Sequence, residues 1–237
     1  MASDQRFFGK TIVITGAGGN FGREGCIFFA SRGAKVAALD LNEKALDETI
    51  SEVRTIVQAS LNLKSPGEIN IKAIKCDVTS VESVEASMNT VVETYGGIDL
   101  LWNNAGYQGQ IKPTLEYDPV DFANVMSINV TGMFIVMQSA AKRMVHASKE
   151  KDSSQNKFSI VNTASVAGLR GTPAMIAYSS SKAAVLAMTV SSAKVRRKST
   201  STSMKVLSFD ANDLIREFLL LFKCHMDPRI LHPTGYE

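Results

Sequence analysis

The chain has 237 residues, of which 45% are hydrophobic and 21% charged, values that exclude a disordered or fibrous protein. Its 26 Lys and Arg against 23 Asp and Glu leave a net charge of +3, too small to indicate a nucleic-acid or membrane partner. Three scattered cysteines, a start without a signal-like apolar core and no apolar run of membrane-spanning length favour a cytoplasmic protein without a disulfide framework.

The first predicted element is a β-branched strand at residues 11–15, which leads into a glycine-rich loop at residues 16–22 and a helix to about Arg32. Glycines let the backbone approach a pyrophosphate closely, and the free N–H groups at the start of the following helix favour the phosphate charge. This order of strand, loop and helix predicts a dinucleotide site with loop contacts from Gly16, Gly19, Asn20, Phe21 and Gly22.

The second predicted strand, residues 35–39, ends at Asp40. A carboxylate at this position can accept hydrogen bonds from both hydroxyls of an adenosine ribose, and it would repel a 2′-phosphate. Asp40 therefore favours NAD over NADP as the cofactor, with a solvated strand end as the alternative interpretation.

A third strand is predicted at residues 71–76, after a polar helix at residues 42–60. It ends at Asp77 and Val78, which are placed to border an adenine ring. Capping of the next predicted helix, residues 81–95, is an equally natural role for Asp77.

The fourth predicted strand, residues 98–102, is followed by Asn103-Asn104-Ala105-Gly106. Amide side chains at a strand terminus can donate and accept hydrogen bonds, and so tie neighbouring loops together. Asn104 is therefore interpreted either as a structural link or as a direct cofactor contact.

A long helix is predicted from Asp121 to about His146, with Asn129 in its interior. Asparagine is mildly unfavourable inside a helix, so its side chain is expected to have a specific partner or to distort the helix. A fifth strand at residues 158–163 then delivers Ser165 to its carboxyl end.

Tyr178 and Lys182 stand four residues apart, a spacing that brings them to one face of a helix. Lowering the pKa of a tyrosine from about 10 to near 7 requires roughly 4 kcal/mol. A cation about 4 Å away supplies roughly 4 kcal/mol at an effective dielectric of about 20. The pair is therefore a candidate for proton transfer at neutral pH, with a chance coincidence of the two residue types as the alternative.

Strands that alternate with helices and never pair through tight hairpins predict an α/β fold with a parallel, doubly wound sheet. Ligands of such sheets bind at the carboxyl ends of the strands. The candidate residues at those ends are Gly16, Asp40, Asp77, Asn104 and Ser165.

Together these motifs resemble the short-chain dehydrogenase/reductase family in its single-domain form, over roughly residues 8–194. The family's Thr-Gly-x-x-x-Gly-x-Gly loop corresponds to residues 15–22, with Asn20 in place of the middle glycine, and its Asn-Asn-Ala-Gly motif is complete at residues 103–106. Because asparagine tolerates a left-handed backbone better than most residues, the turn is expected to survive. Within the family, the loops are most similar to those of xylitol dehydrogenase-like polyol dehydrogenases.

The resemblance implies a Rossmann-type, three-layer αβα fold and an NAD-dependent oxidoreductase that interconverts an alcohol or polyol and a ketone. Its catalytic residues would be Asn129, Ser165, Tyr178 and Lys182. Tyr178 would exchange the proton of the substrate oxygen, and Ser165 would hydrogen-bond the same oxygen. Lys182 would lower the pKa of Tyr178 and hold the nicotinamide ribose, so both residues also count as cofactor contacts. Asn129 would position a water that links Lys182 to solvent.

The chain departs from the family pattern after about Lys194, so it is divided into a Rossmann domain at residues 1–194 and an atypical tail of the same domain at residues 195–237. The family's sixth and seventh strands, its Pro-Gly loop and its substrate-covering helices are not recognisable, although residues 204–209 are a candidate sixth strand. Without a sixth strand the backbone edge of the fifth would be exposed. A truncated or inactive NAD-binding relative is therefore the alternative function, and a homo-oligomer is expected if the tail permits it.

Two features of the tail suggest binding. The basic residues within 195–205 could form a nuclear address or an anion patch, but a solvated helix end and loop is the better interpretation. Cys224, His225 and His232 lack a carboxylate or a second cysteine to complete a metal site, so no metal is predicted.

Overall fold

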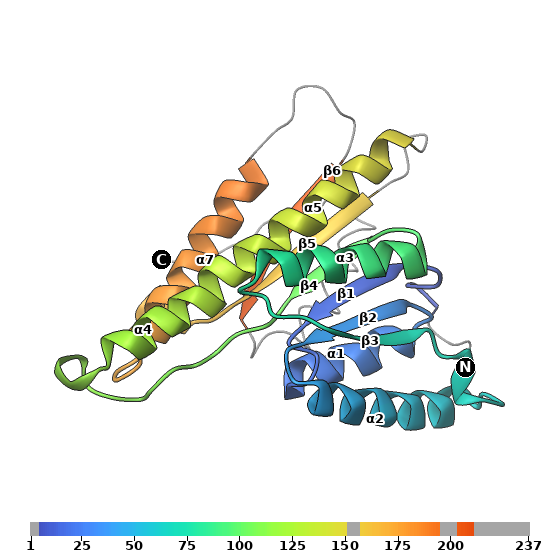
Figure 1. Cartoon of the computed structure of the whole chain (residues 1–237), viewed down its shortest axis with the longest axis horizontal. Helices are drawn as coiled ribbons and strands as arrows, with labels where there is room; N and C mark the ends of the chain where they lie inside the picture. Colours follow the sequence, from blue (N-terminus) through green and yellow to red (C-terminus); the bar gives the residue numbers. More distant parts are fainter. Residues whose placement is uncertain (1–4, 151–156, 195–202, 211–237) are drawn as a thin grey trace, which may run out of the picture.

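The central element of the structure is a parallel sheet of six strands in the order β3-β2-β1-β4-β5-β6, with helices on both faces (Figure 1). This computed structural model describes residues 5–150, 157–194 and 203–210. The strands are β1 (Thr11–Thr15), β2 (Lys35–Asp40), β3 (Ile71–Lys75), β4 (Leu100–Asn103), β5 (Lys157–Ala164) and β6 (Ser203–Asp210).

Helices connect the strands in the alternating order that the sequence predicts. The α-helices are α1 (Asn20–Ala30), α2 (Glu43–Leu61), α3 (Val81–Tyr95), α4 (Pro119–Met126), α5 (Met133–Glu150), α6 (Ala167–Arg170) and α7 (Ile176–Lys194). Three shorter turns are the 3-10 helices η1 (Pro66–Glu68) and η2 (Thr114–Glu116) and the π-helical η3 (Ser127–Gly132).

Different helices cover the two faces of the sheet because successive strand residues point to opposite sides. In β1, Ile12 and Ile14 pack with apolar residues of α1 and α2, whereas Val13 packs with those of α3 and α5. Val185 of α7 is buried together with Met133 and Ala164, near the end of β5. Parallel strands covered on both faces are apolar throughout, and β1 is buried at every position. The predicted three-layer α/β fold is confirmed.

The sixth strand, β6, pairs in parallel with the whole of β5, from Lys157 opposite Ser203 to Ala164 opposite Asp210. The candidate sixth strand at residues 204–209 is therefore confirmed, with one more residue at each end. The backbone edge of β5 that would be exposed without a sixth strand is therefore paired. The backbone groups of β5 that precede Ser165 are paired on this side as well as with β4.

One long helical segment runs from α4 through η3 into α5 (Figure 1). It begins two residues before the predicted start, because the Asp118 side chain caps it by accepting from the Val120 N–H, and Pro119 fits the first turn. The distortion expected near Asn129 is confirmed, since residues Ser127–Gly132 form a π-helical turn.

The same segment corrects the expectation that no apolar run of the chain has membrane-spanning length. Within the described residues, Pro119–Ala147 has the length and apolar composition of a membrane-spanning helix. Its core-facing residues, such as Val136, Ala140 and Met144, are fully buried against the sheet. That arrangement is the ordinary packing of a helix that covers one face of a sheet.

Several expectations about the tail concern residues outside the described ranges. They include residues 195–202 of the basic stretch and the cluster of Cys224, His225 and His232. The family's seventh strand and Pro-Gly loop also have no counterpart in the part of the chain that is described, which ends at Asp210. These expectations stay predictions.

Candidate functional site

The glycine-rich loop closes the carboxyl end of β1 in a tight turn. Gly16 has a φ of +66°, and a Cβ there would lie 2.9 Å from the Ala105 Cα. A larger residue would therefore be strained both by the backbone conformation and by the contact with Ala105. At Gly22 a Cβ would overlap the Gly16 carbonyl oxygen. The first N–H groups of α1 have no acceptor inside the helix, which leaves them available to an anion at this turn.

The turn survives the presence of Asn20, as expected, but for a different reason. Asn20 is the first residue of α1, and it is not among the described residues with positive φ. Helical backbone suits any L residue, so no left-handed conformation is needed at this position. Gly19, Asn20 and Phe21 are exposed on the turn, whereas Gly22 is buried.

The Asp40 carboxylate is fixed at the end of β2. Its Oδ2 accepts from the Gly18 N–H at 2.9 Å and its Oδ1 from the Asn42 N–H at 2.9 Å. Each oxygen keeps a lone pair for a further donor, such as a ribose hydroxyl. Asp40 is half-buried, and its role at the ribose stays a prediction, as does the alternative of a solvated strand end.

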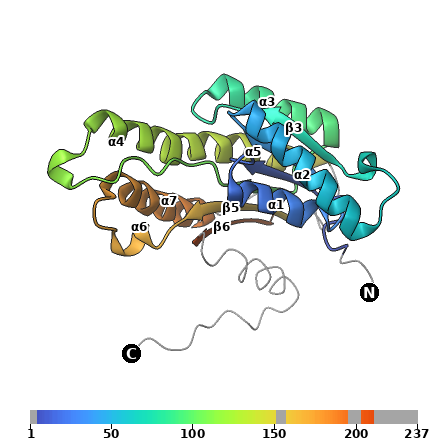
Figure 2. The same cartoon turned by 90° about the horizontal axis from the view of Figure 1, so that it is seen from below.

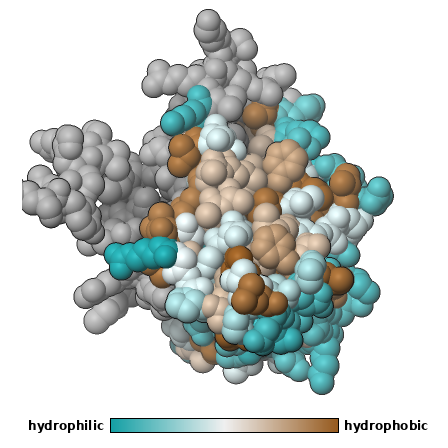
Figure 3. Space-filling view, turned by 90° about the vertical axis from the view of Figure 1, so that its left-hand side faces the viewer, coloured by the Kyte–Doolittle hydropathy of each residue, from teal (hydrophilic) through white to brown (hydrophobic). Residues whose placement is uncertain are grey.

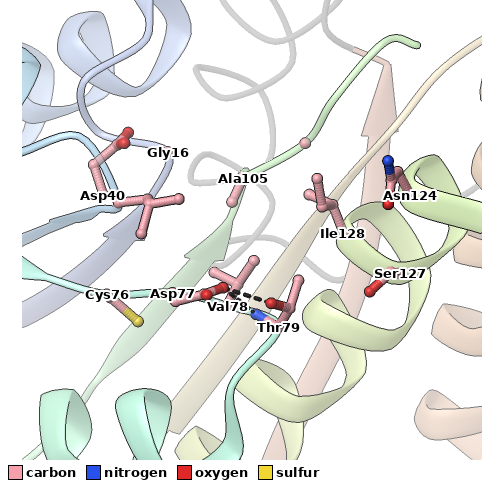
Figure 4. A pocket seen from close by; sticks show the side chains of 12 residues that line it. Gly16, Asp40, Cys76, Asp77, Val78, Thr79, Ala105, Asn124, Ser127 and Ile128 are labelled. Atoms are coloured by element: carbon pink, nitrogen blue, oxygen red, sulfur yellow. Dashed lines mark hydrogen bonds between the residues drawn. The ribbon is translucent and has the colours of Figure 1, made fainter. Parts of the chain in front are cut away.

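A cavity of about 340 Å³ opens beside Asp40, at the carboxyl edge of the sheet (Figure 4). Asp40 lies on one side of it and Asn124 and Ile128 on the other. The cavity lies between the carboxyl ends of β1, β2, β3 and β4 and the junction of α4 and η3. The predicted cofactor contacts that line it are Gly16, Asp40, Asp77 and Val78.

Asp77 stabilises its own turn and does not cap α3. Its Oδ1 accepts from the Thr79 N–H at 2.9 Å and from the Thr79 hydroxyl at 2.7 Å (Figure 4). The cap of α3 is Ser80, whose hydroxyl accepts from the Ser83 N–H at 3.1 Å. The capping interpretation is therefore wrong, and Asp77 holds Val78 at the cavity wall.

Asn104 ties three strands together. Its Nδ2 donates to the Thr15 carbonyl at 3.2 Å, its N–H donates to the Thr15 hydroxyl at 2.9 Å, and its Oδ1 accepts from the Thr163 hydroxyl at 3.2 Å. Asn103, fully buried, donates from Nδ2 to the Met133 carbonyl at 2.7 Å. The structural interpretation of Asn104 is confirmed, and a direct cofactor contact stays a prediction.

Asn129 has the specific partners that its place inside a helix led us to expect. Its Oδ1 accepts from the Tyr107 N–H at 2.7 Å, and its Nδ2 donates to the Tyr107 carbonyl at 2.8 Å and to the Ser181 hydroxyl at 3.0 Å. The side chain is wholly buried. Since both amide hydrogens are engaged, the side chain could hold a water only through the remaining lone pair of Oδ1.

Lys182 lies beside Tyr178, as the four-residue spacing predicts. The Lys182 Nζ is 5.5 Å from the centroid of the Tyr178 ring and donates to the Thr163 carbonyl at 2.6 Å. Only 3% of Lys182 is exposed, and a buried ammonium requires such a partner. Tyr178 is half-buried, so its ring separates the ammonium from part of the solvent.

Ser165 follows β5 directly. Its Oγ accepts from the Ala167 N–H at 3.2 Å, which leaves its own hydrogen to donate elsewhere. Three residues later, Gly168 has no room for a Cβ, which would lie 2.6 Å from the Ala183 nitrogen. The short helix α6 therefore packs directly on the α7 backbone beside Lys182.

The sequence did not identify every residue at the cavity. Asn124, Ser127 and Ile128 line it from α4 and η3, and no local motif distinguishes them. Cys76 also lines it, and burial raises the pKa of its thiol, so this side chain is uncharged at neutral pH. Within the described ranges, no three His, Cys, Asp or Glu side chains are grouped to hold a metal ion.

Comparison with known proteins agrees with this geometry. The family model described as short chain dehydrogenase matches residues 10–203. Levodione reductase of Leifsonia aquatica is 31% identical over 188 residues, which are 79% of this chain and 64% of that protein. The crystal structure of NAD+-bound xylitol dehydrogenase has 40% identity and a TM-score of 0.69, over 79% of this chain and 65% of that one. An actinorhodin polyketide ketoreductase with NADPH has 28% identity and a TM-score of 0.70, over 84% and 68%.

The matched range contains the glycine-rich loop, the Asn-Asn-Ala-Gly motif and the residues Ser165, Tyr178 and Lys182. The chain spans slightly less than two thirds of the length of levodione reductase and of xylitol dehydrogenase. The similarity to xylitol dehydrogenase that the loops indicate is found again in the folded structure. The chain thus belongs to the short-chain dehydrogenase/reductase family.

Proposed function

We propose that the protein is an NAD-dependent oxidoreductase that interconverts an alcohol or polyol and a ketone by hydride transfer. The observation that carries this proposal is the buried Lys182 ammonium against the half-buried Tyr178, on the helix that packs beside the segment after Ser165. When bound, the nicotinamide supplies or accepts the hydride. Tyr178 gives or takes the proton of the substrate oxygen, and Ser165 donates a hydrogen bond to that oxygen.

The other two residues act on Tyr178 and on its surroundings. Lys182 stabilises the tyrosinate form of Tyr178 and holds the nicotinamide ribose. Asn129 connects Lys182 to solvent through a water, for which the unshared lone pair of its Oδ1 is available. Gly16, Gly19, Asn20, Phe21 and Gly22 surround the pyrophosphate, while Asp77, Val78 and Asn104 border the rest of the dinucleotide.

NAD is favoured over NADP by the charges around the ribose position. The Asp40 carboxylate would lie against a 2′-phosphate and repel it. The cation of α1, Arg23, is engaged with Glu52 at 3.0 Å and with the Thr49 hydroxyl at 3.2 Å. It is therefore not free to compensate for a phosphate charge.

NADH is expected to bind roughly tenfold or more tightly than NADPH, a difference of at least about 1.4 kcal/mol. Titration of both reduced cofactors by fluorescence measures this difference in affinity. Asp40→Ala should reduce the difference between NADH and NADPH. Asp47→Asn is the matched control, because Asp47 is an exposed carboxylate on the following helix. Equal affinities in the unsubstituted protein would remove Asp40 from the proposed role.

A direct test of activity is the oxidation of NADH with a panel of ketones and ketoses, and the reduction of NAD+ with alcohols and polyols. Turnover with a member of the panel supports the proposal. The second candidate is an NAD-binding relative without efficient turnover, suggested by the atypical sequence of residues 195–237. Binding of NADH without turnover would support this second candidate, and absence of binding would contradict both.

We also propose that residues 1–194 are the cofactor-binding and catalytic domain, with residues 195–237 as part of it, in a cytoplasmic homo-oligomer without nucleic-acid or membrane partners. Exposed apolar side chains at the α4 end of the molecule support the oligomer; they include Ile111, Leu115 and Val120. Figure 3 views the molecule from this end and shows hydrophobic residues among polar ones. Light scattering of the full chain measures the oligomeric state.

A further inference from the structure

A buried carboxylate, Asp121, holds the segment that connects β4 to α4. We call residues 107–117 of that connection the strap. Asp121 Oδ1 accepts from the Tyr107 hydroxyl at 3.0 Å, and Oδ2 accepts from the Tyr117 hydroxyl at 2.6 Å and the Gln110 N–H at 2.9 Å. Only 7% of Asp121 is exposed, and these three donors satisfy a charge that would otherwise be costly to bury.

The protonation states of this cluster are well defined near neutral pH. The hydrogen bond from Tyr117, followed by that from the Gln110 backbone, lowers the pKa of Asp121. Burial and the bond to Asp121 raise the pKa of Tyr117 to about 12, and Asp121 also raises the pKa of Tyr107. The carboxylate is thus ionised and both phenols are protonated, which is the state that makes all three bonds.

The strap is connected to α7 through Tyr107. The Tyr107 N–H and carbonyl both bond the Asn129 side chain, which donates onward to the Ser181 hydroxyl. Ser181 in turn donates to the Tyr178 carbonyl at 2.7 Å. A continuous set of hydrogen bonds therefore joins Asp121 to the backbone of the first turn of α7.

A second contact lies farther along the strap. The Lys112 N–H donates to the Ala174 carbonyl at 2.9 Å, just before α7 begins. Figure 2 shows the strap running between α4 and the helices α6 and α7. The strap is thus attached to α4 on one side and to the start of α7 on the other.

We infer that Asp121 is a positioning residue for the oxidoreductase site: it fixes the strap, and through the Tyr107 peptide it orients Asn129 and the turn of α7 that carries Tyr178. This inference rests on the proposed function for its effect on turnover. Asp40 and Asp77, at the cavity proposed for the cofactor, accept their hydrogen bonds from Gly18, Asn42 and Thr79, which are outside this set of bonds. Loss of Asp121 should therefore affect the chemical step far more than cofactor affinity.

The test compares Asp121→Asn with Asp118→Asn in the full chain. Asp118 is an exposed carboxylate three residues earlier that caps α4, and asparagine is an equally good cap. Asp121→Asn should lower kcat by roughly tenfold or more and change the Kd of NADH by less than about twofold. Hydrogen exchange should become faster in the strap and also at residues 127–132 and 176–182. Asp118→Asn should change neither kcat nor exchange in these segments.

The inference is wrong if exchange at residues 127–132 and 176–182 is unchanged in Asp121→Asn, or if kcat is unchanged while the strap exchanges faster. If the unsubstituted protein shows no turnover, the proposed function fails and the exchange measurements still decide whether Asp121 orients α7. If Asp121→Asn does not fold, Tyr107→Phe and Tyr117→Phe, which each remove one bond to Asp121, replace it in the same comparison.

Discussion

Replacing Tyr178 with phenylalanine is expected to abolish turnover while leaving the affinity for NADH nearly unchanged. The substitution removes only the oxygen that exchanges a proton with the substrate, and general acid–base catalysis typically contributes about 10²- to 10⁴-fold. The ring that lies 5.5 Å from the Lys182 Nζ remains in place, so the ammonium keeps its surroundings. Steady-state kinetics with the best substrate of the panel, together with NADH titration, measures both effects.

The matched control for this substitution is Tyr95→Phe. The Tyr95 hydroxyl donates to the Val36 carbonyl at 3.3 Å, away from the carboxyl edge of the sheet. This variant should lose some stability and retain turnover. Lys182→Ala should damage both turnover and cofactor binding, because it removes a buried cation and leaves the Thr163 carbonyl without its donor. Full activity of Tyr178→Phe with any alcohol or ketone would defeat the proposed mechanism.

The second large effect is expected at the glycine-rich loop, for Gly22→Ala. The added methyl group would overlap the Gly16 carbonyl and lie 2.7 Å from the Ala17 Cα, so the turn must open. Overpacking of this kind costs roughly 1–3 kcal/mol. An opened turn also misplaces the N–H groups at the start of α1, so NADH affinity should fall by roughly tenfold or more, which corresponds to at least about 1.4 kcal/mol. Thermal unfolding and NADH titration measure the two losses.

Gly19→Ala is the control for this loop. A Cβ at Gly19 would lie 3.5 Å from the Gly16 carbonyl oxygen, an ordinary contact, and Gly19 has a φ of −83° that alanine adopts freely. Its melting temperature should stay close to that of the unsubstituted protein, whatever its effect on a bound pyrophosphate. Equal behaviour of the two variants would contradict the steric argument for Gly22.

The sequence predicted the parts of this fold that depend on neighbouring residues. A β-branched run followed by glycines defines β1 and its turn locally, and the end of β2 at Asp40 follows from the same pattern. Errors occurred where two local signals competed. Ser80, not Asp77, caps α3, and α4 begins at Pro119 because Asp118 is a stronger start signal than Asp121.

Contacts between distant residues could not be predicted in this way. Asp121 and Tyr107 are 14 residues apart across an irregular connection, and no periodicity relates them. The partner of Asn129 was expected without being identified, because an amide inside a helix indicates that a partner exists but not where it lies. The sixth strand was a weak candidate because strand pairing with β5 depends on tertiary contacts more than on its own composition.

The two ends of Tyr107 are held by a single helical segment, the phenol by Asp121 in α4 and the peptide by Asn129 in η3. Because the length of Tyr107 from peptide to phenol is fixed, the separation of Asp121 and Asn129 must match that length. A helix rises about 1.5 Å per residue and turns about 100°. Gaining or losing one residue between Asp121 and Asn129 would therefore move one of the two out of contact with Tyr107. Substitution of exposed side chains on that stretch, such as Asn124 or Ser127, leaves the separation intact. The number of residues between Asp121 and Asn129 therefore constrains this part of the chain more tightly than the identity of its exposed residues.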